Sequence, residues 1–269
     1  MKIGFIGAGN MAEAIISGMM LKNTVEPENI MVFDIDKDKL NRLKECNNIT
    51  LAVSNEEIIK NCDYAVLAVK PHIYEPLLKN LKDMIQEKKP VLISIAAGIK
   101  LSKMAEFLGD TTIPVIRVMP NVCVSVLEGM SAICGGETVL PKDLEVALNI
   151  FSSIGKTVEI EEKFFEVYAG IAGCSPAFTF MFIEGLAKAG LKNGLSKKDA
   201  TKIAAQAVFG SAKMILEMGE HPISSVDKVT SPGGTTIAGV AKLEEKAFIS
   251  TMIEAVEATM KRDRELQNS

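Results

Sequence analysis

The segment Thr230–Gly239, TSPGGTTIAG, combines residue types that bind an anion and orient a nitrogen atom. Pro232–Gly234 predicts a turn, and Thr235 and Thr236 open the helix predicted after it. The first amides of a helix have no partner within it, so beside flexible glycine backbone they form a small anion site that fits a carboxylate. The hydroxyls of Ser231 and Thr236 add groups that donate or accept hydrogen bonds. The alternative is a capped helix after a glycine turn, which needs no substrate.

A glycine-rich loop near the N-terminus, GAGNMA, has the spacing G-x-G-x-x-A. It follows a predicted strand and opens a predicted helix, which is the context of a dinucleotide-binding loop. Gly7 allows the tight turn, Gly9 lets the backbone approach a pyrophosphate, and Ala12 keeps helix and strand close. The sequence therefore predicts a cofactor-binding loop that includes Asn10 and Met11. A strand–helix turn without a ligand is the alternative.

An acidic residue, Asp34, ends the second predicted strand in VFDID. A carboxylate there can accept hydrogen bonds from the adenosine ribose hydroxyls and would repel the 2′-phosphate of NADPH. The position favours NADH. Two alternatives stay open: Asp34 caps the following helix, or Lys37 or Lys39 receives a phosphate.

The ends of two later strands are predicted to line the nicotinamide side of the same cleft. AVKPH contributes Ala68, Lys70 and Pro71, and SIAAG contributes Ala96 and Ala97. The small alanines leave room for a flat ring. Lys70 either binds an anionic group or is a solvated loop lysine.

The reaction is constrained by the scarcity of acid–base groups. Reduction of a ketone usually needs a general acid, often His or Lys. His72 and His221 are the chain's two histidines, and neither has an obvious catalytic setting. A protonated imine already carries the positive charge that attracts hydride, and a hydroxyl can orient its nitrogen. A site of hydroxyls and amides therefore favours reduction of a C=N bond.

The elements that must position these residues change in kind near residue 160. Before it, short β-branched runs alternate with helical patterns, which predicts an α/β domain with a doubly wound, mainly parallel sheet. After it, the pattern is helical throughout, and Ser196 with Asp199 predicts a capping box. The predicted domains are 1–160 for dinucleotide binding and 161–269 for a helical domain. The predicted helices of the second domain are 175–193, 197–219, 234–245 and 247–267.

Composition excludes several classes of partner. The chain has 269 residues and a net charge of −4, and no basic cluster follows a phosphate backbone, so a nucleic acid is not expected. The five cysteines are widely spaced without a CxxC pair, which argues against a zinc site or any metal and favours a reducing cytoplasm. Glu13 interrupts the apolar N-terminus, so no signal peptide is expected. The uncharged run 167–183 is short for a membrane span and predicts a helix buried in a core or a subunit interface.

With these motifs in view, the chain closely resembles the pyrroline-5-carboxylate reductase family. The resemblance runs nearly end to end through GFIGAGNMAEAI, LAVKPH, SIAAGI, VIRVMPN, GCSPAF, GLSKKDATKIAAQAVFGSAKM and SPGGTTIAGVAKLE. The last motif looks like the family's signature and is far more specific than the glycine pattern. The resemblance implies reduction of 1-pyrroline-5-carboxylate to L-proline by hydride transfer from NADH or NADPH, the last step of proline biosynthesis.

The resemblance also implies roles for individual residues. Thr236 would hydrogen-bond the ring nitrogen of the substrate as the catalytic residue. Asn55 matches a position that contacts the adenosine side of the cofactor. The substrate-binding set would be Ser231, Gly233, Gly234, Thr235 and Thr236. The cofactor-binding set would be Gly7, Gly9, Asn10, Met11, Asp34, Asn55, Ala68, Lys70, Pro71, Ala96 and Ala97.

The family's architecture is a Rossmann domain followed by a helical domain that makes an intertwined homodimer, in some members a ring of dimers. The active site then lies between one subunit's cofactor domain and the partner's helices. This chain departs from the family at Asp34-Ile35-Asp36, where many members have Asn-Arg or Ser-rich sequence that binds the NADPH phosphate. That pocket looks missing here, which again favours NADH.

Two other functions share parts of this pattern. A β-hydroxyacid dehydrogenase carries a lysine one turn into the helix after a Gly-x-x-Gly motif. GIAGCSPAFTF has Phe178 and Thr179 in that region, and the first lysine on the helix, Lys188, comes too late. A nonenzymatic nucleotide-binding regulator would bind NADH without turnover and would not need an ordered pocket at Ser231 and Thr236.

Overall fold

The computed structural model describes residues 1–267, which divide into two compact units. Residues 1–173 and the described residues from Arg262 onward form the Rossmann unit, and Cys174–Lys261 form the helical unit. The predicted functional domains, 1–160 and 161–269, stay predictions, and positions 268 and 269 lie outside the described residues.

One mainly parallel sheet of eight strands forms the centre of the Rossmann unit, in the order β3-β2-β1-β4-β5-β6-β7-β8. Neighbours are parallel except β6 and β7, which are antiparallel. The predicted doubly wound, mainly parallel sheet is confirmed. Its strands are β1 (Ile3–Ile6), β2 (Ile30–Phe33), β3 (Thr50–Leu51), β4 (Tyr64–Leu67), β5 (Val91–Ser94), β6 (Val115–Pro120), β7 (Gly129–Gly135) and β8 (Gly155–Glu159).

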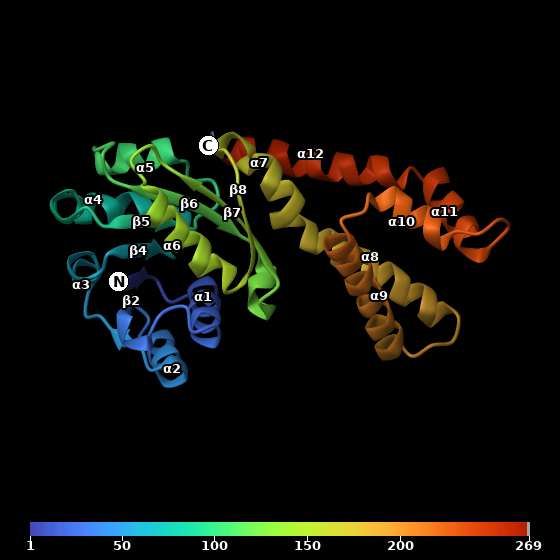
Figure 1. Cartoon of the computed structure of the whole chain (residues 1–269), viewed down its shortest axis with the longest axis horizontal. Coiled ribbons are helices and arrows are strands. Elements are labelled where there is room, and N and C mark those ends of the chain that lie inside the picture. The colour runs from blue at the N-terminus through green and yellow to red at the C-terminus, as the bar shows by residue number, and fades with distance from the viewer. Residues whose placement is uncertain (268–269) are drawn as a thin grey trace. The chain divides into compact units, whose positions relative to one another are not determined.

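Helices cover both faces of this sheet, as the ribbon in Figure 1 shows. Successive side chains of a strand point to opposite faces, and the central strands are apolar on both. Phe5 therefore packs in the core beneath α1, α2 and α6, whereas Ile6 packs in the core beneath α3, α4 and α5. The helices are α1 (Asn10–Leu21), α2 (Lys37–Asn47), α3 (Asn55–Asn61), α4 (Pro71–Lys88), α5 (Leu101–Leu108), α6 (Pro141–Ser152) and the short α7 (Phe165–Tyr168).

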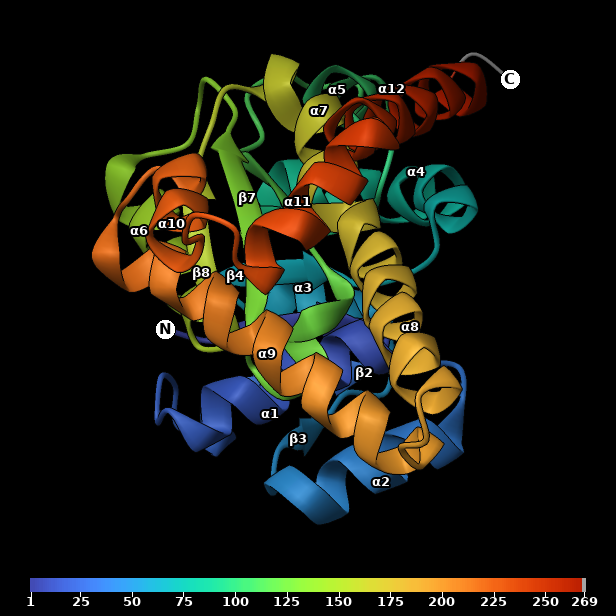
Figure 2. The ribbon, with the colours of Figure 1, turned by 90° about the vertical axis from the view of Figure 1, so that its right-hand side faces the viewer.

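The helical unit begins with a hairpin of two long helices, which lie side by side in Figure 2. A Cβ added at Gly190 would lie 2.9 Å from the Cβ of Ala200, so small residues permit this close packing. Ser196 caps the second helix by accepting from the Asp199 amide at 3.1 Å, as predicted. From residue 175 onward the helices are α8 (Ser175–Lys192), α9 (Lys197–Met218), α10 (Pro222–Val229), α11 (Thr235–Glu245) and α12 (Phe248–Gln267). The last residues of α12, from Arg262, belong to the Rossmann unit.

The helical unit exposes much of its apolar surface in the single chain. Its buried apolar core is small, comprising the alanines 187, 200 and 204. Phe180, Met181 and Phe182 on α8 are exposed, and Met181 is 75% exposed. The stretch Glu162–Lys192 is also long and apolar enough to cross a membrane by length and composition alone. Contiguous apolar surface of this kind marks an interaction site.

Candidate functional site

The predicted cofactor residues gather at one edge of the sheet, at the carboxyl ends of its parallel strands. The strand order reverses between β1 and β4, which is the place where doubly wound sheets bind ligands. Gly7, Gly9, Asn10 and Met11 lie between β1 and α1, Asp34 follows β2, Asn55 opens α3, Ala68, Lys70 and Pro71 lie between β4 and α4, and Ala96 and Ala97 follow β5. The structure thus brings the set together, while each residue's contact with a cofactor stays a prediction.

Gly7 is required by the close approach of three strand ends. Its φ of +106° is a conformation that residues with a side chain rarely adopt. A Cβ there would lie 2.6 Å from the carbonyl oxygen of Ala68. The Gly7 amide donates to the carbonyl of Phe33 at 2.8 Å. Gly7 therefore holds the loops after β1, β2 and β4 against one another.

Gly9, in contrast, faces open space. It is the N-cap of α1, with φ −75° and ψ 176°, and no side chain caps the helix. A Cβ built on it would meet no atom within 4 Å. The first amides of α1 and this open backbone make a cradle that fits a phosphate group. Gly9 and the start of α1 therefore fit a dinucleotide, because they leave open the space into which the pyrophosphate would come.

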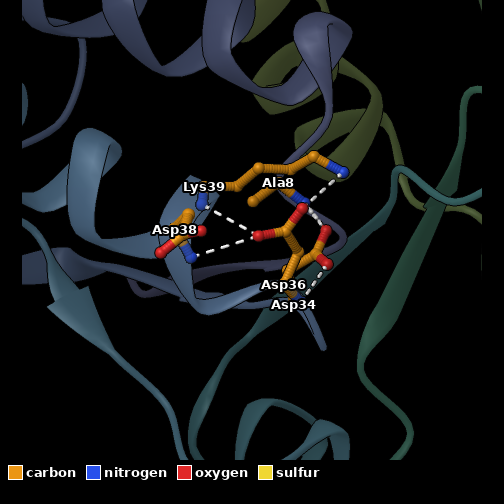
Figure 3. Close-up of polar contacts among 5 residues, drawn as sticks. All are labelled: Ala8, Asp34, Asp36, Asp38 and Lys39. Carbon is orange, nitrogen blue, oxygen red and sulfur yellow. Dashed lines mark hydrogen bonds and ion pairs between the residues drawn. The ribbon is translucent and has the colours of Figure 1, made fainter.

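Asp34 is hydrogen-bonded to the glycine-rich loop, as Figure 3 shows. Its carboxylate accepts from the Ala8 amide at 2.7 Å and from the Asp36 amide at 2.9 Å. Sequence reasoning missed Ala8, because a backbone amide carries no signature in the residue type. The carboxylate oxygens have further lone pairs, which can accept from ribose hydroxyls.

Asp36, rather than Asp34, caps α2, so the alternative that Asp34 caps this helix is wrong. The Asp36 carboxylate accepts from the amides of Asp38 at 3.1 Å and Lys39 at 3.3 Å. The Lys39 ammonium lies 3.3 Å from the same carboxylate. Hydrogen bonds from the Lys39 amide and side chain hold the pKa of Asp36 below its ordinary value. The charge of Lys39 is thus partly balanced within the loop.

The nicotinamide side has the small residues that the sequence predicted. Ala68 is half-buried, Ala96 is buried and Ala97 is exposed. Lys70 is exposed as the N-cap of α4, with Pro71 as the first helical residue. Both interpretations of Lys70, as an anion ligand or as a solvated lysine, stay open.

The predicted substrate loop forms a tight turn followed directly by α11. Gly233 has φ +69°, and the Gly234 amide donates to the Ser231 carbonyl at 2.9 Å, so proline and glycine occupy the two central turn positions they favour. A Cβ on Gly234 would lie 2.5 Å from the Ser231 hydroxyl oxygen. Thr235 and Thr236 are exposed in the first turn of α11, whose N-cap is Gly234, with no side-chain cap. The turn therefore leaves amides and hydroxyls available to a carboxylate.

The two histidines lie at helix starts. His221 is the N-cap of α10 and accepts from the Ile223 amide at 3.3 Å. His72 is exposed in the first turn of α4. The predicted sites therefore offer mainly amides, hydroxyls and the Asp34 carboxylate, whose contact with a ribose stays a prediction.

Comparison with known proteins matches both halves of the chain. A family model described as pyrroline-5-carboxylate reductase dimerisation matches residues 162–266. A second, described as NADP oxidoreductase coenzyme F420-dependent, matches residues 2–98. These matches cover the helices around the substrate loop and the strands around the glycine-rich loop.

Whole-chain relatives are consistent with these matches. Pyrroline-5-carboxylate reductase of Methanosarcina acetivorans is 41% identical over 98% of this chain and 97% of its own. The structure of the reductase from Coxiella burnetii superposes with a TM-score of 0.94 at 34% identity, covering 98% of each chain. The Plasmodium falciparum reductase, with NADP bound, gives a TM-score of 0.86 at 33% identity over 100% of this chain and 98% of that one. The chain therefore belongs to the pyrroline-5-carboxylate reductase family, as its motifs predicted.

Proposed function

We infer that the chain is an NAD(P)H-dependent reductase that converts 1-pyrroline-5-carboxylate to L-proline, the last step of proline biosynthesis. The observation that carries this assignment is sequence similarity to reductases along the whole chain, with 41% identity to the relative from M. acetivorans. Its support in the structure is the pair of uncapped helix starts at Gly9 and Gly234. One fits a pyrophosphate, and the other fits a carboxylate. The widely spaced cysteines support a cytoplasmic location.

In the proposed reaction the chain binds and orients a cyclic imine. The turn at Ser231, Gly233 and Gly234 and the first amides of α11 hold the carboxylate. Thr236 hydrogen-bonds the protonated ring nitrogen and keeps the C=N carbon exposed to attack. NAD(P)H, when bound, supplies the hydride that adds to this carbon. The new C–H bond takes the electron pair of the hydride, the C=N π electrons become the nitrogen lone pair, and the product is a secondary amine.

The test is oxidation of NADH and, separately, NADPH with pyrroline-5-carboxylate, followed by absorbance. Turnover with imine present, and none without it, is the expected result. Tight nucleotide binding without turnover would instead favour the regulator. Turnover with a 3-hydroxyacid and NAD⁺, but not with the imine, would favour the β-hydroxyacid dehydrogenase.

We expect NADH to be preferred over NADPH, because Asp34 places a negative charge where the 2′-phosphate would lie. Asp34→Asn removes this charge and keeps one acceptor oxygen for the Ala8 amide, while the Asp36 amide loses its acceptor. The ratio of kcat/KM for NADH to that for NADPH should fall by about tenfold, which corresponds to about 1.4 kcal/mol.

Asp38→Asn is the matched control, because Asp38 is an exposed carboxylate in the first turn of α2, four residues after Asp34. Its cofactor ratio should change by less than about twofold, since exposed charges are screened by salt. A wild-type preference for NADPH would overturn the role given to Asp34 and would direct attention to Lys37 and Lys39.

The helical unit is proposed to form a homodimer, with a ring of dimers as a further assembly. Its exposed apolar side chains on α8 support this, together with the dimerisation model that matches residues 162–266. Light scattering should give twice the chain mass of 29.0 kDa or a multiple of it. Met181→Glu should shift the population toward monomer, because burying an unpaired charge is costly. Leu21→Glu, at an exposed position on α1, should leave the mass unchanged.

A further inference from the structure

A buried tyrosine that the sequence analysis did not single out links the ends of β4 and β5. Tyr74 lies on α4 and is 0% exposed. Its hydroxyl donates to the carbonyl of Leu67, the last residue of β4, at 2.5 Å. The same oxygen accepts from the hydroxyl of Ser94, the last residue of β5, at 3.3 Å. One phenol therefore joins two strands and a helix at the cofactor edge of the sheet.

The hydroxyl occupies the point at which the β4–β5 ladder stops. Leu67 and Ser94 are the final pair in the parallel register. The Ala68 amide donates to Ile6 on β1 at 2.8 Å, so the preceding carbonyl, that of Leu67, points toward β5. The tyrosine thus bridges polar groups that the separating strands can no longer pair with each other.

The residues next to this bridge are the predicted cofactor contacts. Ala68 follows Leu67 directly, and Ala96 lies two residues after Ser94. Ala68 also packs against the glycine-rich loop, since its carbonyl oxygen lies 2.6 Å from the position that a Cβ on Gly7 would take. A displacement at Tyr74 would therefore reach the nicotinamide side of the cleft through main-chain atoms.

We propose that Tyr74 is a positioning residue, which holds the loops after β4 and β5 in the geometry that the nicotinamide cofactor requires. The role rests on the proposed function, because it concerns the cofactor of that reaction. Tyr74 acts through Leu67 and Ser94, and its ring packs in the core beneath α4.

Tyr74→Phe removes only the hydroxyl and leaves the ring in place. The buried Leu67 carbonyl and the Ser94 hydroxyl then lose their bond to the phenol, and the strand ends are free to shift toward other partners. We expect the Kd for NADH, measured by calorimetry without imine, to rise about tenfold. The KM for NADH should rise with it, while the KM for the imine stays within about twofold of wild type.

Tyr64→Phe is the matched control for a merely structural role. Tyr64 is also a buried tyrosine, and its hydroxyl donates to Asp143 at 2.7 Å. It lies at the first residue of β4, the end of that strand away from the predicted cofactor contacts. Both variants should lower Tm, but Tyr64→Phe should leave the Kd for NADH within about twofold of wild type.

Ser94→Ala tests the same bridge if Tyr74→Phe does not fold. It removes one hydrogen bond to the phenol and keeps the bond to Leu67, so the Kd should rise by about threefold. An unchanged Kd in both Tyr74→Phe and Ser94→Ala, or an equal rise in Tyr64→Phe, would overturn the positioning role while wild-type turnover persists. A wild-type protein that binds no nucleotide would overturn the proposed function together with it.

Discussion

Replacing Gly9 with alanine should abolish tight binding of the nicotinamide cofactor and leave the fold intact. Gly9 has φ −75° and ψ 176°, which alanine adopts without strain, and its Cβ would meet no atom within 4 Å. The added methyl would instead fill the space that lets the backbone approach a pyrophosphate. We expect Tm to change by less than about 2 °C and the Kd for NADH to rise by at least about thirtyfold. Thermal unfolding and calorimetric titration measure the two effects separately.

Gly7→Ala is the informative comparison with Gly9→Ala, because a Cβ at position 7 would clash with other atoms of the protein. It would lie 2.6 Å from the Ala68 carbonyl oxygen at a φ of +106°, so both a backbone clash and conformational strain arise. The free energy of unfolding should fall by about 2–4 kcal/mol, and cofactor binding should weaken as well. If Gly9→Ala bound NADH as tightly as wild type, the glycine-rich loop would not approach a pyrophosphate, and the cofactor assignment of this loop would be wrong.

Much of the fold was predictable because long elements have a strong periodic pattern. The helices expected at 175–193, 197–219, 234–245 and 247–267 are confirmed within one residue at each end. Shorter elements carry too few residues to express a period. Thr50–Leu51 and Pro222–Val229 were not predicted as a strand and a helix for that reason.

The candidate site was predictable where a residue type has a conformational or chemical meaning. The positive φ of Gly7 is predictable because glycine adopts this conformation readily. The turn before α11 is predictable because proline and glycine favour its two central positions. Contacts made by the main chain were not predictable, because every residue has an amide and a carbonyl. The Ala8 amide on Asp34 and the Leu67 carbonyl on Tyr74 depend on the register of separate strands, which only the folded sheet determines.

Replacing Thr236 with alanine should lower kcat/KM for the imine by about a hundredfold, in the range found when a single hydrogen-bonding group at the transition state is removed, because the hydroxyl would accept a hydrogen bond from the protonated ring nitrogen. Thr236 is exposed in the first turn of α11, and no hydrogen bond of its hydroxyl joins it to the rest of residues 1–267. Alanine is a better helix former than threonine, so the fold loses nothing by the change. The proposed role of the hydroxyl is to orient the protonated ring nitrogen for hydride addition. The Kd for NADH should stay within about twofold of wild type, because the substitution lies outside the nucleotide loop.

Thr236→Ser keeps the hydroxyl and removes only the methyl group, so it should retain kcat/KM within about threefold of wild type. A loss shared by both variants would mean that the methyl group, through packing against the substrate ring, matters more than the hydroxyl. Unchanged kcat/KM in Thr236→Ala would remove Thr236 from the catalytic role, since a group that stabilises the transition state cannot be deleted without cost. The amides at the start of α11 and the hydroxyl of Ser231 would then be the remaining contribution of this loop, and they would bind the carboxylate equally in substrate and transition state. That outcome would place the selectivity of the loop in substrate binding and leave the hydride step to the geometry of the two bound molecules.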